Sequence, residues 1–386
     1  MRKVCVVVLS RANYGRIKSV MKAIKEHPDL ELQVITGASM LLDRFGNAVE
    51  VLRNDGFEVN ETVYMIIEGE NPTTMAKSTG LAIMELATSY ENIAPDIVLS
   101  VADRFETMAT AVAARYMNIP LAHTQGGEAS GSIDESIRHA ITKLSHIHFV
   151  STRLSAERVF RMGESRENIH VTGCPSLDII AGTDLNITDS LKKFVRSQGV
   201  GGSVDIEKDY IVVSQHPVTT EYESAAGQIK ETLSAVYGLR LPAIWLWPNV
   251  DAGSDAISKE IRKFREHHNT DFIRFFKNFT VEDYARIIYN SKCVIGNSSS
   301  GIREGSFMGV PAVNIGTRQS GRERSDNVID AGYKKDEITS AVKKQLAHGR
   351  YKKSPLYGDG TSGRQIADIL ARCKVVIQKN CNDGIR

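Results

Sequence analysis

Short runs of aliphatic and β-branched residues alternate along this chain with longer amphipathic stretches, and this alternation limits the folds open to it. The runs in the first half are VCVVVLS, ELQVITG, DIVLSVA, IPLAHT and HIHFVST, each followed by a pattern of helical length. The rhythm begins again after Asp209 with YIVVSQH, AIWLWPN, FIRFFKN, CVIGNS and PAVNIG. Such alternation predicts βαβ units and parallel sheets. The expected fold class is α/β, with two Rossmann-like, doubly wound domains facing each other across a cleft.

The length of the chain agrees with two domains. Its 386 residues are too many for one ordinary core and suit two α/β domains. Between the two halves, the stretch RSQGVGGSVDIEKD is polar and rich in glycine, as linkers are. We expect a first domain at 1–185, a linker at 186–207 and a second domain at 208–360.

The composition favours a small-molecule partner. Lys and Arg number 48 against 46 Asp and Glu, so the net charge of +2 predicts neither a nucleic-acid partner nor a membrane surface. There is no apolar run of the length that spans a bilayer, and MRKVCVVVLS is too short for a signal peptide. The five cysteines have no metal-ligand spacing and fit a reduced, cytoplasmic protein. No metal site is expected.

In doubly wound sheets ligands bind beyond the carboxyl ends of the strands, so the residues after each run are the candidates for a site. SRANYGR follows the first run and places Arg11 where a helix begins, a position suited to an anion. The chain lacks G-x-G-x-x-G there and has no P-loop motif, which argues against NAD, FAD and a P-loop nucleotide site. After DIVLSVA come Asp103 and Arg104, either an acid beside a phosphate clamp or simply a helix N-cap.

The stretch AHTQGGEASGSIDESIRHAITKL concentrates acidic residues next to glycines. Gly126 and Gly127 are expected to let the backbone turn towards a ligand, which leaves Glu128 at the end of a strand as the strongest single catalytic candidate. The helix that follows starts with the pattern S-x-x-E, a capping box in which Glu135 is either structural or a candidate for substrate binding. Asp134 lies in its first turn, where it either complements the helix dipole or acts on substrate, and Arg138 adds a polar group.

The second half repeats this arrangement. His216 directly follows a strand and precedes a proline, a position that suits general acid and base chemistry near neutral pH. Asn249 follows the next strand. The motif GNSSSGIREG presents hydroxyl and N–H groups to a diphosphate, with Glu304 one turn later for a ribose. The remaining candidates for binding the anion or its loop are Ser298, Ser299, Ser300, Gly301, Arg318 and Arg322.

Taken together, these motifs resemble the hydrolysing UDP-N-acetylglucosamine 2-epimerases, including the epimerase half of the bifunctional enzyme of sialic acid synthesis. The resemblance spans about residues 8–330 and rests on SRANYG, ADRFE, GGEASGSIDESIRHAITKL, GCPSLD, QHPVTTE, GNSSSGIREG and GTRQSGRE. It implies the GT-B-like fold, with a C-terminal helix in 361–386 that packs back on the first domain. It also implies a homodimer or homotetramer.

The resemblance assigns roles to particular residues. It implies that Asp103, Glu128, Asp134 and His216 are the acid and base residues. UDP binding carries over to Ser299, Ser300 and Glu304 of the second domain and to Arg11 and Arg104 of the first. Two positions depart from the family pattern: Ala102 stands where many members have glycine, and Gln125 stands where relatives often have Glu or His. Glutamine cannot transfer protons, so a mechanism that uses this position is in doubt here.

The expected reaction converts UDP-GlcNAc to ManNAc and UDP by elimination to a 2-acetamidoglucal and hydration, with inversion at C2, and needs no cofactor. This reaction would supply sialic acid or related nonulosonic acid and capsule biosynthesis. The alternatives are the same reaction on a UDP-2,4-diacetamido-trideoxyhexose, a non-hydrolysing epimerase that returns UDP-ManNAc, and a retaining GT-B glycosyltransferase. A nucleotide-sugar binding module without turnover is the alternative from a different class.

Overall fold

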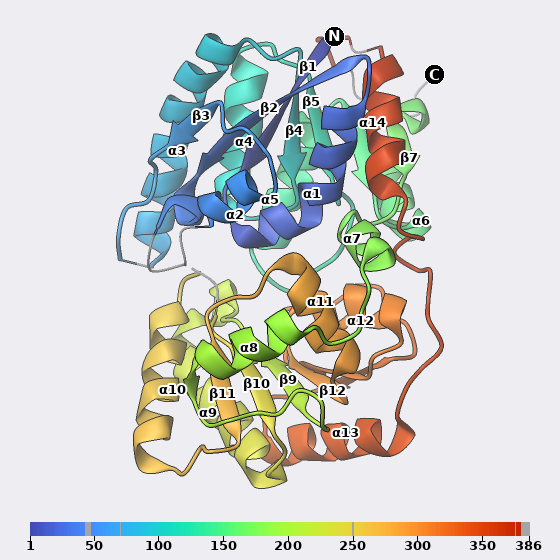
Figure 1. The fold of residues 1–386 in the computed structure, drawn as a ribbon. Helices are drawn as coiled ribbons and strands as arrows, with labels where there is room; N and C mark the ends of the chain where they lie inside the picture. The colour runs from blue at the N-terminus through green and yellow to red at the C-terminus, as the bar shows by residue number, and fades with distance from the viewer. Residues whose placement is uncertain (43–47, 70, 249–250, 375, 380–386) are drawn as a thin grey trace. The chain divides into compact units, whose positions relative to one another are not determined.

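The computed structural model divides into two compact units (Figure 1). The residues that it describes are 1–42, 48–69, 71–248, 251–374 and 376–379. Unit 1 comprises Met1–Glu128, Ile133–Ala181 and Tyr357–Arg386, and unit 2 comprises Ala129–Ser132 and Gly182–Leu356. Each unit has one seven-stranded sheet and a hydrophobic core of its own. No helix in the described part of the chain is long and apolar enough to cross a membrane.

The sheet of unit 1 is parallel throughout, in the order β3-β2-β1-β4-β5-β6-β7. Its strands are β1 (Arg2–Val8), β2 (Leu30–Gly37), β3 (Glu61–Val63), β4 (Ile97–Val101), β5 (Leu121–Thr124), β6 (Ile147–Val150) and β7 (Ile169–Val171). Its helices are α1 (Arg11–Glu26), η1 (Ala38–Leu41), α2 (Val49–Asn54), α3 (Pro72–Ile93), α4 (Phe105–Tyr116), α5 (Asp134–Leu144), α6 (Arg153–Arg161), η3 (Arg166–Asn168), α7 (Ser176–Gly182) and α14 (Ser362–Arg372).

Strand β1 shows how this sheet is buried on both faces. Val4 and Val6 pack with α1 and α14 in one hydrophobic cluster, while Cys5 and Val7 pack with α3 and α4 in another. Successive side chains of a strand point to opposite faces, so helices on both faces require a strand that is apolar throughout. The continuous apolar run in the sequence therefore has a direct physical cause.

Unit 2 has the same architecture with one antiparallel edge. Its sheet order is β14-β13-β12-β9-β10-β11-β8, and only the pair of β11 with β8 is antiparallel among the described strands. Its strands are β8 (Val200–Gly201), β9 (Ile211–Ser214), β10 (Ala243–Leu246), β11 (Ile273–Phe276), β12 (Cys293–Gly296), β13 (Ala312–Ile315) and β14 (Val328–Ala331). Its helices are α8 (Asp189–Ser197), η4 (Thr219–Ser224), α9 (Ala225–Leu239), α10 (Ser254–His267), α11 (Val281–Asn290), η5 (Ser299–Gly301), α12 (Arg303–Met308) and α13 (Lys335–His348).

The α/β fold class expected from the sequence is confirmed, and all ten apolar runs form strands. The expected linker at 186–207 requires correction, because it contains α8 and β8 and clusters with unit 2. Helix α8 buries Leu191 and Val195 and has Thr188 as its N-cap, so a short amphipathic helix lies within a stretch that reads as polar.

The C-terminal helix α14 belongs to unit 1 and packs on α1, as the fold expectation states. Leu370 joins the core cluster of α1. At the start of α14, the backbone N–H groups of Ser362 and Gly363 donate to the Asp178 carboxylate at 3.0 and 2.5 Å. At its end, Arg2 donates to the Leu370 carbonyl. A carboxylate at the N-terminus and a cation at the C-terminus both complement the helix dipole. Contacts at both ends therefore hold α14 in place within unit 1.

A buried charge cluster holds the C-terminal end of α5, the helix that carries the acidic stretch. Glu164 is 3% exposed and interacts with Lys143 at 2.7 Å, Lys379 at 2.6 Å and His148 at 3.1 Å. Lys379 Nζ also donates to the carbonyls of Lys143 at 2.7 Å and Ser145 at 2.6 Å. These carbonyls lie at the end of α5, where the helix dipole favours a cation. The cluster therefore fixes the helix from its C-terminal side.

This cluster predicts a pH-dependent stability. Burial by itself raises the pKa of Glu164, but hydrogen bonds from His148, Lys143 and Lys379 outweigh burial and lower the pKa from 4.5 to about 2. A carboxyl group whose pKa is lower in the folded than in the unfolded chain adds stability above its unfolded pKa and loses it as the pH falls. Glu164→Gln should therefore lower the free energy of unfolding more at about pH 6 than at about pH 3, as measured by urea unfolding.

Glu157→Gln is the matched control, since Glu157 pairs with Arg161 on the surface of α6. Its effect should be small and equal at both pH values. An equal loss at both pH values for Glu164→Gln would contradict the assignment of the cluster.

Candidate functional site

Strands β4 and β5 of unit 1 are each followed by a residue with a left-handed backbone. Ala102 follows β4 with φ 62°, and Gln125 follows β5 with φ 64°. This conformation costs a non-glycine residue about 1–2 kcal/mol, and such strain gathers at functional sites. Glycine, which the resemblance places at position 102 in many relatives, adopts a positive φ readily. The two turns lead into Asp103 and towards Glu128.

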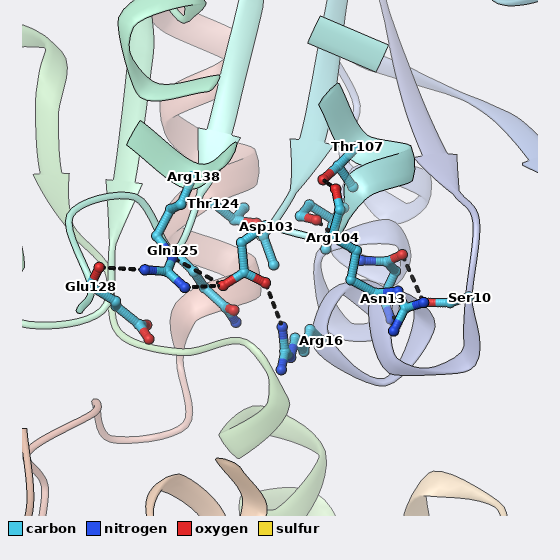
Figure 2. A network of polar contacts seen from close by, with 12 residues as sticks. Ser10, Asn13, Arg16, Asp103, Arg104, Thr107, Thr124, Gln125, Glu128 and Arg138 are labelled. Carbon is cyan, nitrogen blue, oxygen red and sulfur yellow. Dashed lines mark hydrogen bonds and ion pairs between the residues drawn. The ribbon is translucent and has the colours of Figure 1, made fainter. Parts of the chain in front are cut away.

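Asp103 forms a buried ion pair with Arg138, which reaches it from α5 (Figure 2). Arg138 Nε donates to Asp103 Oδ2 at 2.9 Å, and Nη2 contacts the same oxygen. Arg16 of α1 approaches the other carboxylate oxygen at 3.7 Å. The side chains of Arg138 and Asp103 are 1% and 9% exposed. The N-cap of α4 is Arg104, so the simple reading of Asp103 as the N-cap residue is wrong.

Arg138 also reaches the turn after β5. Its Nη1 donates to the backbone carbonyl of Glu128 at 2.5 Å, and Figure 2 shows this carbonyl, rather than the carboxylate, facing the guanidinium. Burial acts to lower the pKa of Arg138, but the nearby charges of Asp103 and Glu128 outweigh it and raise the pKa, so the side chain stays cationic. One buried cation therefore ties together the ends of two neighbouring strands.

Glu128 is 2% exposed, and its carboxylate accepts a hydrogen bond from Ser151 at 2.9 Å. Ser151 directly follows β6, so the carboxylate is held by the next strand of the sheet. The sequence predicted Glu128 at the end of a strand, and in the structure it lies beyond the turn that follows β5, which ends at Thr124. It gave no signal for Ser151, because a serine after a strand is common and carries no distinctive spacing.

The diglycine turn has a packing role within unit 1. A Cβ on Gly127, whose φ is 73°, would lie 2.2 Å from the carbonyl oxygen of Ser155 in α6. A Cβ on Gly126 would lie 2.9 Å from the hydroxyl of Thr142 in α5. Close approach of two helices therefore explains both glycines, and contact of this turn with a ligand stays a prediction.

The two arginines expected to bind phosphate in unit 1 differ in their surroundings. Arg104 Nε donates to both carboxylate oxygens of Glu106 at 3.2 Å, and the Glu106 side chain is 2% exposed. The acidic neighbour was visible in the sequence, but its pairing with Arg104 was not predicted. Arg11 opens α1, and burial lowers its pKa to about 10, which leaves it cationic at neutral pH.

His123 lies close to Asp103 but serves the structure. Its Nε2 lies 2.8 Å from the Ala102 carbonyl, so Nε2 carries the proton, and Thr142 Oγ1 lies 3.3 Å from Nδ1. Burial, the largest effect, lowers the pKa of His123 to about 3. The ring is neutral at physiological pH and both nitrogens are engaged, so His123 braces the turn after β4.

The predicted capping box of α5 is wrong. The N-cap residue is Ile133, without a side-chain hydrogen bond, and the buried Ser132 hydroxyl has no hydrogen-bond partner among the described residues. Glu135 lies 3.5 Å from His139 one turn later in α5. Asp134 occupies the first turn, and its charge acts on Arg138. Because Ser132 is not the N-cap residue, the S-x-x-E pattern forms no capping box here.

In unit 2 the segment after β12 forms a compact serine loop. Ser298 is the N-cap of η5, and its hydroxyl lies 2.8 Å from that of Ser300. Tyr284 of α11 approaches Ser300 Oγ at 2.9 Å. Burial raises the pKa of Tyr284 to about 12, so its hydroxyl keeps its proton at neutral pH. The sequence offered no signal for Tyr284, which sits within an ordinary amphipathic helix.

The other predicted residues of unit 2 surround this loop or the neighbouring strand ends. His216 follows β9 and is 7% exposed, while Glu304 occupies the first turn of α12. Arg318 Nη1 donates to the carbonyl of Asn297 at 3.3 Å, and Arg322 is 6% exposed. Ser299 and Gly301 are the ends of η5, and Asn249 lies outside the described residues.

Two Rossmann-like units, with polar groups gathered after the carboxyl ends of their strands, define a GT-B-like α/β protein. A solved structure with this fold is the UDP-GlcNAc 2-epimerase of Methanocaldococcus jannaschii in complex with UDP-GlcNAc and UDP. It is 18% identical, with a TM-score of 0.77 over 95% of this chain and 99% of that chain.

The family model of UDP-N-acetylglucosamine 2-epimerase matches residues 22–371. UDP-N,N'-diacetylbacillosamine 2-epimerase (hydrolyzing) of Legionella pneumophila is 35% identical over 369 residues, which cover 96% of this chain and 95% of that protein. Polysialic acid biosynthesis protein P7 of Escherichia coli is 31% identical over 345 residues, which cover 89% of this chain and 85% of that protein. The chain therefore belongs to the UDP-N-acetylglucosamine 2-epimerase family, which confirms the resemblance seen in the sequence.

The buried ion pair predicts a large effect of removing its cation. Arg138→Met leaves the Asp103 carboxylate buried without its main partner, so the free energy of unfolding should fall by about 3–5 kcal/mol. Arg161→Met is the control, because Arg161 pairs with Glu157 on the exposed face of α6. That change should cost about 0.3–0.5 kcal/mol. Chemical denaturation measures both, and similar small losses would show that the Asp103 pair does not stabilise the turns.

Proposed function

We propose that this protein is a hydrolysing 2-epimerase, which converts a UDP-linked 2-acetamido sugar and water to UDP and the free sugar inverted at C2. The observation that carries the proposal is the buried pair of Asp103 and Arg138 with Glu128 beside it, at the carboxyl edge of the sheet in unit 1. Burying carboxylates costs free energy. A reaction that removes and returns a proton at C2 of the sugar needs acid and base groups, and carboxylates at this edge of the sheet can supply them.

The chemistry explains why several acid and base groups are needed. The C1–O bond breaks with its electron pair leaving on UDP, and a base removes the C2 proton to give a 2-acetamidoglucal. Water then adds at C1, and an acid delivers a proton to C2 from the opposite face. The C2 hydrogen is not adjacent to a carbonyl, so C1–O cleavage leads and carboxylates stabilise the oxocarbenium character of C1.

The proposal assigns these steps to groups that the resemblance also implies. Asp103, Glu128, Asp134 and His216 form the proposed acid and base set. Cations and helix N-termini stabilise the departing diphosphate. The proposed UDP ligands are Ser298, Ser299, Ser300, Gly301, Glu304, Arg318 and Arg322, with Arg11 and Arg104 from unit 1.

Two donors compete. The family description and the sequence motifs favour UDP-GlcNAc, which gives ManNAc. The Legionella relative, at 35% identity over nearly the whole chain, specifically favours UDP-N,N'-diacetylbacillosamine, which carries a second acetamido group at C4. Either product would supply sialic acid or a related nonulosonic acid, in keeping with the Escherichia coli relative of polysialic acid biosynthesis.

Phosphorus and proton NMR of the purified protein with each donor in turn tests this proposal. Free UDP with a free sugar of the manno configuration is the expected result. The donor that is converted at the higher rate is the substrate. A UDP-linked manno sugar would identify a non-hydrolysing epimerase instead. Saturable binding of both donors with no new product would identify a binding module and overturn the proposal.

Glu128→Gln should lower kcat by about two to four orders of magnitude, because the amide keeps the size of the side chain and loses the proton-transfer group. The affinity for UDP, measured by calorimetry, should stay within error of wild type. Glu157→Gln, on the surface of α6, should leave both quantities unchanged. Normal turnover by Glu128→Gln would remove this residue from the mechanism.

Ser300→Ala should mainly weaken nucleotide binding. Loss of one neutral hydroxyl contact raises the Kd for UDP about three- to tenfold. Ser306→Ala is the control, since this buried hydroxyl donates only within α12, to the carbonyl of Arg303 at 2.9 Å. A fall in kcat with unchanged UDP affinity would contradict the place assigned to Ser300.

A further inference from the structure

We infer that Asn297, a buried residue between β12 and the serine loop, is a positioning residue that sets the backbone of His216 and of the loop carrying Arg318. The inference rests on the proposed function, because it concerns how unit 2 presents groups used in that reaction. None of the sequence motifs assigned Asn297 a role, although it is the first residue after its strand.

The side chain of Asn297 pairs with the backbone of His216 through two reciprocal hydrogen bonds. The His216 N–H donates to Asn297 Oδ1 at 2.8 Å, and Asn297 Nδ2 donates to the His216 carbonyl at 2.8 Å. Asn297 is 1% exposed, so water does not compete for these bonds. The amide of Asn carries an acceptor and a donor side by side, which match the N–H and the C=O of a peptide.

The backbone of Asn297 holds a third segment. Its carbonyl accepts hydrogen bonds from Gln319 Nε2 at 2.8 Å and from Arg318 Nη1 at 3.3 Å. Both residues lie in the loop that follows β13. Asn297 therefore joins the chain ends after β9, β12 and β13, and each of these three ends carries predicted site residues.

The close approach of β12 to β9 leaves little room for another arrangement. A Cβ on Gly296, whose φ is 128°, would lie 2.1 Å from the carbonyl oxygen of Ser214. The N–H of Asn297 donates to that same carbonyl at 3.2 Å. This contact fixes the backbone at position 297. The side chain of Asn297 can therefore determine the position of the His216 backbone.

Asn297→Asp tests the inference with an almost unchanged shape. An ionised aspartate has no donor for the His216 carbonyl and repels it, whereas a protonated aspartate donates again. Burial raises the pKa of a carboxyl, so protonation falls within an accessible pH range. Among the described residues, the ionisable side chains of His216 and Arg318 adjoin this junction, and wild type measured over the same range accounts for their own titration.

We expect kcat/KM of Asn297→Asp to fall about a hundredfold relative to wild type at about pH 8, the scale of a small misplacement of a reacting group. The ratio to wild type should recover at least about tenfold towards pH 5.5 as the aspartate takes up a proton. Asn297→Ala should lose activity to a similar degree with no such recovery. If Asn297→Asp does not fold, Asn297→Ala still tests the inference.

Gln345→Glu is the matched control. Gln345 is a fully buried amide of the same unit that donates to the carbonyls of Ala312 at 2.7 Å and Asn327 at 2.8 Å. Its change to an acid should destabilise the fold comparably, yet leave the ratio of kcat/KM to wild type independent of pH. A pH-dependent recovery in both variants would assign Asn297 a purely structural role and overturn the inference.

The outcomes separate the two proposals. If the wild-type protein turns over neither donor, the proposed function is wrong, and this inference is wrong with it. If the wild-type protein is active and the Asn297 variants are equally active, only the inference is overturned. Hydrogen exchange of the His216 amide gives a readout besides activity: it should be faster in Asn297→Ala than in wild type, and equal rates would show that the reciprocal pairing does not hold this backbone.

Discussion

The geometry of unit 1 depends on one buried cation, the guanidinium of Arg138. It binds the carboxylate of Asp103 after β4 and the carbonyl of Glu128 after β5, and it reaches both from a third element, α5. Removing a guanidinium from water is costly unless its donors are satisfied, and here acceptors from two strand ends satisfy them. The site is therefore only as well ordered as α5, which the Glu164 and Lys379 cluster holds at its far end.

Unit 2 solves the same problem with neutral groups. The segments that follow β9, β12 and β13 must be held next to one another. The side-chain amide of Asn297 pairs with the backbone of His216, and the backbone carbonyl of Asn297 accepts a hydrogen bond from Gln319. Burying a neutral amide costs less desolvation free energy than burying an ion pair. It also leaves the local charge to the groups that bind a diphosphate. The contrast fits the proposed division of labour, in which carboxylates act on the sugar and hydroxyl and cationic groups bind UDP.

The sequence predicted the central strands of both sheets, because a strand buried on both faces must be continuously apolar, as β1 and β9 are. It did not predict β3, β7, β8 or β14, which are the edge strands of the two sheets, have two to four residues each and need little apolar surface.

The sequence named the candidate residues one by one but did not predict the contacts between them. Strand-end positions of Asp103 and Glu128 follow from local patterns, whereas the pairing of Asp103 with Arg138 joins residues 35 apart in sequence. The pairing of Asn297 with His216 joins residues 81 apart, and it depends on the order of strands in the sheet. The sequence predicted that Gly126 and Gly127 turn the backbone towards a ligand, whereas packing against α5 and α6 accounts for both residues.

The central claim is that the family fold here serves proton exchange at C2 of a UDP-linked 2-acetamido sugar. The most direct measurement is the deuterium content of the product formed in heavy water, read by proton NMR and mass spectrometry. The account predicts a free manno sugar that carries one deuterium at C2, in every molecule formed. A manno sugar without deuterium at C2 would mean that the proton is never exchanged with solvent, and release of UDP with unchanged configuration at C2 would contradict epimerisation altogether.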